Sequence, residues 1–200
     1  KDYKVHIAEM KLHVTYITLN PAIKQAHDAN FKAGKHSIMQ FQKVEVTTRQ
    51  FPTGLSELSF NNFISGGIEP KQILIGLVKT KSFDGDKSTS PFCFKNFNVK
   101  KVYLRRNNAI YPHEPPVCNF EKGDYIIPYT EFLQNTGYDE RDDSSLIQFV
   151  GYKEDYCLFA FDLTPDRCVS YHHHKAVRGH LDIKMELSEP TTEPVTMIVL

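Results

Sequence analysis

The chain has 200 residues, 40% of them hydrophobic and 24% charged, which is an ordinary composition for a globular protein. This length suits one domain with a sizeable core. Lysine plus arginine number 24, as do aspartate plus glutamate, so the formal net charge is zero. The balance weighs against a dedicated nucleic-acid-binding protein, which usually carries a basic excess, and it leaves little self-repulsion to oppose association between copies.

The four cysteines form no C-x-x-C pair and no regular disulfide framework. Cys157 falls within the apolar run from Tyr156 to Phe161 and is expected to be a buried thiol. The sequence contains no secretory signal and no apolar stretch near 18 residues, so we expect no membrane segment and a reducing intracellular place of synthesis. The strand pattern begins almost at Lys1, which fits a fragment of a longer protein.

The first part of the chain predicts a bent strand and a short helix. Apolar residues alternate at Tyr3, Val5 and Ile7 and then, one residue out of phase, from Met10 to Tyr16, as a β-bulge near Ala8-Glu9 would produce. Asn20-Pro21 supplies an N-cap and a proline at the first helical position. We therefore predict a helix over Pro21–Ala33, closed by Gly34.

The central stretch, from Asn61 to Tyr111, predicts a sheet with a buried strand at its centre. Gln72–Val78 is a branched apolar run without alternation, typical of a strand buried on both faces. Three aromatics that follow it, Phe92, Phe94 and Phe97, are expected to fill the core. Before it, Ser37–Thr48 predicts a strand, and Gln50–Phe63 is expected to be mostly irregular, with one helical turn at Ser56–Phe60.

The remaining patterns complete an all-β prediction. The Asn107-Asn108 turn joins two short strands, proline-rich Pro112–Asp124 predicts a loop, and Asp139–Ser145 predicts an acidic surface loop. Tyr125–Gln134 predicts a helix with Pro128 in its first turn and Gly137 after it. Strands are expected at Val99–Leu104, Ala109–Tyr111, Leu146–Tyr152, Tyr156–Leu163, Leu181–Leu187 and Val195–Leu200. About eight or nine strands with long connections favour a Greek-key or jelly-roll sandwich, with one domain over residues 1–200.

Candidate chemistry is sparse, and each candidate has a structural interpretation. His172-His173-His174, with His180 nearby, could belong to a cupin-like metal site, but consecutive strand residues face opposite sides and the H-x-H-x-E spacing is absent. The acidic run Asp139, Glu140, Asp142 and Asp143 lacks the calcium-loop pattern, and Asp84-Gly85-Asp86 predicts a turn. No G-x-S-x-G elbow accompanies the serines. Basic residues at Lys100, Lys101, Arg105 and Arg106 are expected at an exposed strand end. We predict no enzyme activity, no metal and no cofactor.

Four segments in this order resemble one family. Gly67-Ile-Glu-Pro70 with Gly76 matches a "G-x-x-P-x-x-I-x-x-G-x-V" strand, and Ser90-Pro-Phe-Cys-Phe94 matches "N-P-F-x-F" with serine for asparagine. Asp162–Asp166 matches "D-L-T-P-D", and Gly179–Leu187 matches "G-x-L-x-I-x-x-x-F" with leucine at the end. Together they look like the C-terminal part of the major capsid proteins of Polinton (Maverick) elements and adintovirus-like viruses.

The resemblance implies a double-jelly-roll capsid protein of which these residues are the second roll. Copies of the chain would form a homotrimer, a pseudo-hexagonal capsomer that joins other capsid proteins in the icosahedral shell of a virion made in a host cytoplasm or nucleus. Subunit contacts are expected from Pro112–Asp124, Tyr138–Ser145 and Val169–Gly179, whose mixed composition suits interfaces; the residues are His113, Tyr138, Arg141 and Tyr171. Two alternatives stay open: a recognition module that binds carbohydrate or a receptor through end loops, and a cupin-like enzyme that uses His172, His174 and His180.

Overall fold

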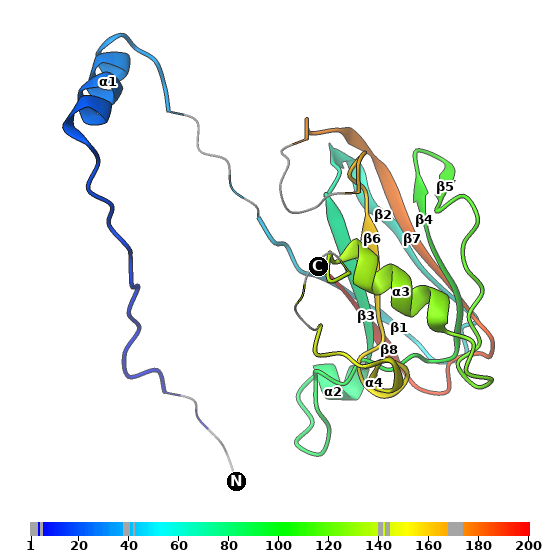
Figure 1. The fold of residues 1–200 in the computed structure, drawn as a ribbon. Helices are drawn as coiled ribbons and strands as arrows, with labels where there is room; N and C mark the ends of the chain where they lie inside the picture. Colours follow the sequence, from blue (N-terminus) through cyan, green and yellow to red (C-terminus); the bar gives the residue numbers. More distant parts are fainter. Residues whose placement is uncertain are drawn as a thin grey trace. The chain divides into compact units, whose positions relative to one another are not determined.

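Eight strands form two four-stranded antiparallel sheets in a computed structural model that describes residues 4, 6–37, 41, 43–139, 142, 145–167 and 174–200 (Figure 1). The first sheet has the strand order β1-β8-β3-β6, and the second has the order β2-β7-β4-β5. The strands are β1 (Thr47–Phe51), β2 (Glu57–Ile68), β3 (Gln72–Lys79), β4 (Val99–Arg106), β5 (Ala109–Tyr111), β6 (Leu158–Asp162), β7 (Arg178–Leu187) and β8 (Val195–Val199). The helices are α1 (Pro21–Lys32), α2 (Thr80–Phe83), α3 (Ile126–Asn135) and α4 (Phe149–Glu154).

The pairing follows the jelly-roll scheme. The chain makes four nested antiparallel pairs, β1 with β8, β2 with β7, β3 with β6 and β4 with β5. These pairs describe one long hairpin whose tip is the Asn107-Asn108 turn, where both residues have positive φ. Rolling the hairpin adds the pairs β3–β8 and β4–β7 and so divides it into two sheets. The predicted all-β jelly-roll sandwich is confirmed.

The core lies between the sheets because the strands alternate. In β7 every second side chain from Leu181 to Leu187 is buried, and the intervening residues are partly exposed. The non-alternating run in β3 leaves Ile73, Ile75, Leu77 and Val78 buried, as predicted for a strand covered on both faces. Each such side chain removed from water contributes roughly 1.5–3 kcal/mol, so burial of the two inner faces stabilises the sandwich.

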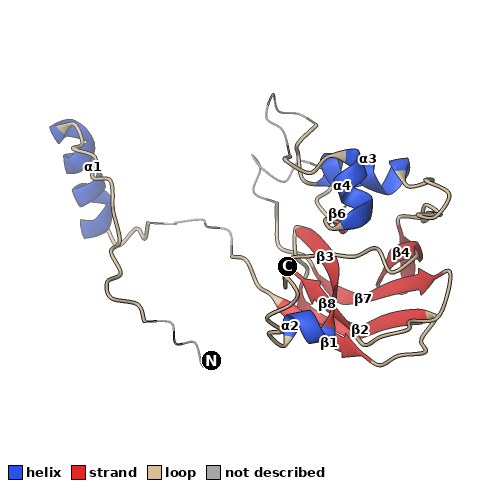
Figure 2. Ribbon diagram, turned by 90° about the horizontal axis from the view of Figure 1, so that it is seen from below, coloured by secondary structure: helices blue, strands red, loops and turns tan. Residues whose placement is uncertain are grey.

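Helix α3 covers the outer edge of the first sheet beside β6. Asn135 Nδ2 at its end donates to the Ala160 carbonyl at 2.7 Å, and the Gln72 side chain donates to the Asn135 carbonyl. Figure 2 shows α3 and α4 together on this side of β6. The predicted helix over Tyr125–Gln134 is confirmed, with Pro128 in its first turn and Gly137 at φ +73° after its end.

The sandwich is formed by Val44–Leu200, and Lys1–Lys43 is a separate compact unit. In that first unit the predicted helix is confirmed: Asn20 Oδ1 accepts a hydrogen bond from the Ala22 backbone N–H at 3.0 Å, and proline occupies the first turn. The strand predicted from Tyr3 to Tyr16 is wrong for its described residues, which form no strand and are exposed. A strand needs a partner for its backbone groups, and the described residues supply none here.

Three other element predictions are wrong. Among the described residues of Ser37–Thr48, only Thr47 and Thr48 belong to a strand, and Met39 lies outside the described residues. The segment Gln50–Phe63, predicted to be irregular, contains the end of β1 and half of β2, because pairing with β7 holds it extended. Leu146–Tyr152, predicted to be a strand, instead leads into α4.

The aromatics after β3 differ in burial. Phe94 and Phe97 are half-buried, but Phe92 is 74% exposed and does not fill the core. Phe94 packs over Gly76, the one interruption in the apolar run of β3: a Cβ on Gly76 would lie 2.5 Å from Phe94 Cδ1 and 3.0 Å from Leu158 Cδ2. The glycine therefore makes room for the aromatic ring.

Candidate functional site

Two of the four predicted contact residues lie in the described part of the chain. His113 is exposed in the loop that begins after a cis Tyr111–Pro112 peptide bond. Tyr138 follows α3, where its backbone N–H donates to the Leu133 carbonyl at 2.9 Å, and its side chain is half-buried rather than fully exposed. Tyr171 and Arg141 lie outside the described residues.

The predicted contact loop Pro112–Asp124 is irregular, as expected, and anchored at one end. The backbones of Asn119 and Asp124 exchange hydrogen bonds of 2.7 and 2.8 Å, and Cys118 N–H donates to the Lys100 carbonyl at 2.8 Å. Phe120 is buried and stacks on Tyr125, with ring centroids 5.4 Å apart. These hydrogen bonds and the ring contact therefore fix the C-terminal end of the loop.

The histidine candidates do not assemble within the described ranges. His172 and His173 lie outside them, and His174 Nε2 is 2.9 Å from Asp166 Oδ1. His180 is exposed on β7, where its backbone pairs with Asn107. Among the residues that the structure describes, no three His, Cys, Asp or Glu side chains are grouped to hold a metal ion.

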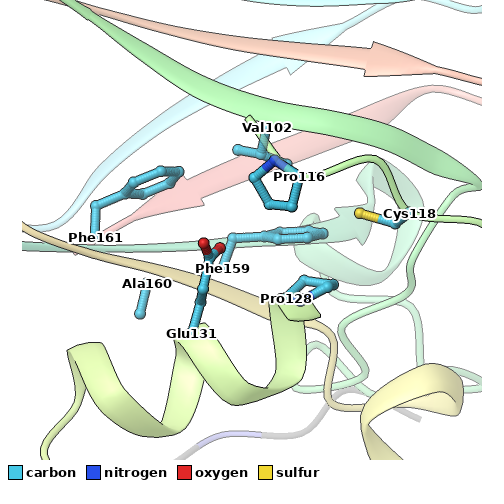
Figure 3. A pocket seen from close by; sticks show the side chains of 8 residues that line it. All are labelled: Val102, Pro116, Cys118, Pro128, Glu131, Phe159, Ala160 and Phe161. Carbon is cyan, nitrogen blue, oxygen red and sulfur yellow. The ribbon is translucent and has the colours of Figure 1, made fainter. Parts of the chain in front are cut away.

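A cavity of about 10 Å³ lies between α3, β6 and the loop before Cys118 (Figure 3). That volume is about the space of one water molecule, far below the several hundred Å³ of a typical ligand site. Burial raises the pKa of Glu131 in its wall, against an opposing effect of Arg167, and burial raises the pKa of the Cys118 thiol to about 12. A thiol with this pKa is protonated at neutral pH and is a poor nucleophile.

An open hollow of about 690 Å³ lies beside α2 and carries paired charges. Lys79 Nζ is 2.6 Å from Glu193 Oε1, and Lys81 Nζ is 2.5 Å from Asp86 Oδ2. The hydrogen bond from Lys81, with those from Ser88, lowers the pKa of Asp86 to about 2. The predicted Asp84-Gly85-Asp86 turn is confirmed, with Gly85 at φ +102°.

Cys93, Lys95 and Asp155 meet at the surface. Cys93 Sγ donates to Asp155 Oδ1 at 2.8 Å, and Lys95 Nζ lies 2.5 Å from the same oxygen. Burial, followed by the hydrogen bond to Asp155, raises the pKa of the Cys93 thiol. The thiol is thus held protonated, and the cluster fastens the segment after β3 to the end of α4.

An aromatic stack unites the two helices beside β6. Tyr125, just before α3, stacks on Phe149 of α4 at 4.4 Å between centroids, and Tyr129 meets Tyr152 edge-on at 5.4 Å. Tyr152 is fully buried and its hydroxyl donates to the Leu158 carbonyl at 2.9 Å. Both helices are therefore fixed to the sandwich.

Helices α3 and α4 and the residues that flank α4 also carry several apolar side chains that are exposed to solvent. We call this set the helical cap surface; its members are Ile126 (58% exposed), Ile127 (51%), Leu146 (90%), Val150 (64%) and Tyr156 (49%). Sequence reasoning missed it because Leu146–Tyr152 was predicted to be a strand. A helical spacing of Phe149 and Tyr152 on one side, with Val150 on the other, was the available signal.

No family model matches the chain. A sequence comparison finds similarity to an uncharacterized protein of Caenorhabditis elegans, with 23% identity over 135 residues. The match covers 66% of this chain and 32% of the relative, so the chain spans about a third of that protein's length. Neither finding assigns the chain to a family.

The described part of the chain contains no helix that is both long enough and apolar enough to span a bilayer. The two hollows described above are a water-sized cavity and an open depression lined by paired charges. Many of the exposed apolar side chains in this part of the chain, including Ile126, Ile127 and Val150, lie outside the sheets.

Proposed function

We propose that the chain is the second jelly-roll domain of a double-jelly-roll major capsid protein of the Polinton or adintovirus type. The observation that carries the proposal is the coincidence of the family-like motifs with the jelly-roll framework. Gly76 lies in β3, Asp162–Asp166 begins at the last residue of β6, and Gly179–Leu187 lies in β7, whereas Ser90–Phe94 lies between α2 and β4. Three of the four motifs thus include strand residues of a fold that capsid subunits use.

The motif residues have structural tasks. Asp162 is buried at the end of β6, where its Oδ1 accepts hydrogen bonds from Thr164 N–H at 2.8 Å and Thr164 Oγ1 at 2.7 Å. Gly179 leaves room for the Glu69 carboxylate, which pairs with Arg106 Nη2 at 2.6 Å. These motif residues stabilise the fold and form no reactive site. This is what we expect of a capsid subunit, whose role is structural.

The proposed subunit contacts combine the predicted loops with the helical cap surface. His113 and Tyr138, with Arg141 and Tyr171, are the contact residues expected from the sequence. Ile127 and Val150 of the helical cap surface add exposed apolar side chains to this set. Apolar and aromatic side chains within a polar surround are typical of protein interfaces.

The mass of the full-length protein under native conditions tests the proposal. Light scattering across a concentration series should give a trimer, or larger particles that dissociate to trimers. A monomer at every concentration would overturn the proposal. Alanine at Tyr138 and Tyr171 should weaken assembly without changing the melting temperature, and unchanged assembly would remove those two residues from the contacts.

The alternative of a carbohydrate- or receptor-binding module predicts a concave face lined by aromatic side chains. The larger described hollow is lined by Lys79, Lys81, Asp84, Asp86 and Glu193, with no aromatic among its lining residues. No observation in the described residues favours the alternative over the capsid proposal. Binding in a glycan screen by the monomeric protein would reverse that preference.

A further inference from the structure

The segment before α1 has the side-chain pattern of a half-buried strand, but it pairs with no strand among the residues that the structure describes. Met10, Leu12, Val14 and Tyr16 are 84%, 88%, 56% and 91% exposed, and Lys11, His13 and Thr15 alternate with them. We call Met10–Tyr16 the arm. Alternation of this kind is typical of a strand with one face on a core and the other in water.

Helix α1 shows the same lack of a covering surface. None of its residues is buried, and Ile23 and Phe31 are 48% and 56% exposed. An isolated helix of this length is marginal in water, because most helical stability in proteins comes from packing of an apolar face. The apolar side chains of α1, like those of the arm, are therefore exposed and not packed on a core.

The edges of the sandwich are poor acceptors for such a strand. Edge strand β5 has only three residues. Edge strand β6 is covered by α3, and Asn135 Nδ2 of that helix donates a hydrogen bond to the Ala160 carbonyl of β6. Edge strand β2 carries register shifts after Phe60 and Ser65, with its Asn62 N–H bound to Asp182 Oδ1 at 2.7 Å. Bulges, short strands and covering helices are the usual means of preventing edge pairing.

The remaining edge, β1, spans only five residues, Thr47–Phe51. The arm alone has seven residues with a continuous apolar face. Because a second copy of this chain offers the same four edges, a copy is as poor an acceptor as the chain itself. The acceptor that the arm requires is an open sheet edge beside an unfilled apolar core.

We propose that the arm is a strand that completes a sheet of another β-sheet domain, one that belongs to the same protein and lies outside these 200 residues. Met10, Leu12, Val14 and Tyr16 enter the core of that domain, and Lys11, His13 and Thr15 face solvent. The relative from Caenorhabditis elegans, about three times longer than the region matched, has room for such a domain. Covalent linkage favours this acceptor over a separate molecule because it raises the effective concentration.

Hydrogen exchange measured by mass spectrometry tests the inference in two proteins, the 200-residue chain and the full-length natural protein. In the full-length protein the arm amides should exchange at least tenfold more slowly than in the 200-residue chain. Equal, fast exchange in both would overturn the inference. So would protection in the 200-residue chain, whether concentration-dependent, which indicates a second copy, or concentration-independent, which indicates the chain's own sandwich.

Charge substitutions test the orientation of the arm. Leu12→Lys and Val14→Lys should abolish the protection in the full-length protein, whereas Thr15→Lys, on the opposite face, should preserve it. Equal effects of Thr15→Lys and Leu12→Lys would contradict the assigned faces. The melting temperature of the sandwich controls for misfolding, since residues Val44–Leu200 form their own core.

The inference stands without the capsid proposal. A protein that protects the arm but remains monomeric would support the added strand and overturn shell formation. A protein that assembles while the arm amides exchange fast would support shell formation and overturn the added strand.

Discussion

Gly76 is the residue at which the tight packing of β3 is most easily tested. A Cβ there would lie 2.5 Å from Phe94 Cδ1, so the ring has to move. We expect Gly76→Ala to lower the free energy of unfolding by about 1–3 kcal/mol, the usual cost of overpacking. Gly67→Ala is the matched control, because its Cβ would meet its nearest neighbour, Ile64 Cγ2, at 3.4 Å. Urea denaturation that finds equal effects for the two variants would contradict the packing assigned to Gly76.

Glu131 carries a partly buried carboxyl group whose titration should make the stability of the fold depend on pH. The Glu131 side chain lies in the wall of the small cavity (Figure 3), and its burial raises the pKa of the carboxyl in the folded chain above the ordinary value of 4.5. As the pH rises through 4.5, the unfolded chain ionises first, so this group's contribution to stability falls until the pH exceeds the folded-state pKa. Below 4.5 both states are protonated, and the contribution no longer changes.

Glu131→Gln removes this titration. We therefore expect the Gln variant to melt at a higher temperature than the parent at pH 7, and the gap to close at pH 4. Glu121→Gln, in an exposed loop, is the control and should shift neither melting temperature. A Gln variant that is less stable at pH 7 would show that the electrostatic attraction between Glu131 and Arg167 outweighs the cost of burying the Glu131 carboxylate.

At this scale the sequence predicted the classes of several residues but not their neighbours. The apolar run predicted burial of Ile73 and Ile75, and Cys157 was expected to be a buried thiol; it has no exposed surface. The exposed position of Phe92 could not be predicted, because it depends on which side of the loop meets the sheet. The pairing of Glu69 with Arg106 joins residues 37 positions apart and has no local signal.

The elements that were misassigned are those whose conformation is set by tertiary contacts. Most of β2 is the stretch LSFNNFISGG, residues 58–67, in which apolar and polar residues alternate only weakly and the register shifts twice. Its pairing with β7 determines its extended conformation. Helix α4 has only six residues, and it is held by the stacking of Phe149 on Tyr125 and by the edge-on contact of Tyr152 with Tyr129. In contrast, α1 was predictable because its Asn20-Pro21 start is a local signal.

Tyr152 tests whether the aromatic stack holds α4. The side chain is fully buried, and its hydroxyl donates to Leu158. We expect Tyr152→Ala to cost about 3–5 kcal/mol of folding free energy, as for other large core truncations. Tyr156→Ala, two residues after α4 and 49% exposed, should cost less than about 1 kcal/mol. Chemical denaturation with similar losses for both variants would contradict this account of the stack.

For the whole molecule, the class of fold could be predicted because eight strand patterns with long connections leave few architectures. The strand order could not, since the nested pairs join residues as distant as Thr47 and Val199. The contact residues proposed from the sequence rest on loop composition. The helical cap surface could not be predicted from the sequence, because it depends on the helical conformation of Phe149–Glu154.

Assembly should depend on the helical cap surface. In the full-length protein we expect Ile127→Asp with Val150→Asp to reduce the assembled fraction at least tenfold, because burial of two charges in an apolar contact is unfavourable. Both side chains are more than half exposed, so the melting temperature of the unassembled subunit should remain within a few degrees. Ser188→Asp adds a charge at another exposed loop and should leave assembly intact. Sedimentation velocity gives the assembled fraction, and normal assembly of the double variant would exclude this surface as a contact.

The central claim, that this β-sandwich is a building block of a shell, is tested most directly by electron microscopy of the purified full-length protein. We expect uniform capsomers with a pseudo-hexagonal outline, or closed particles built from them, in which the sandwich of Val44–Leu200 fits the density as one of two rolls per subunit. A field of single, unassociated molecules at every concentration and salt condition would contradict the claim.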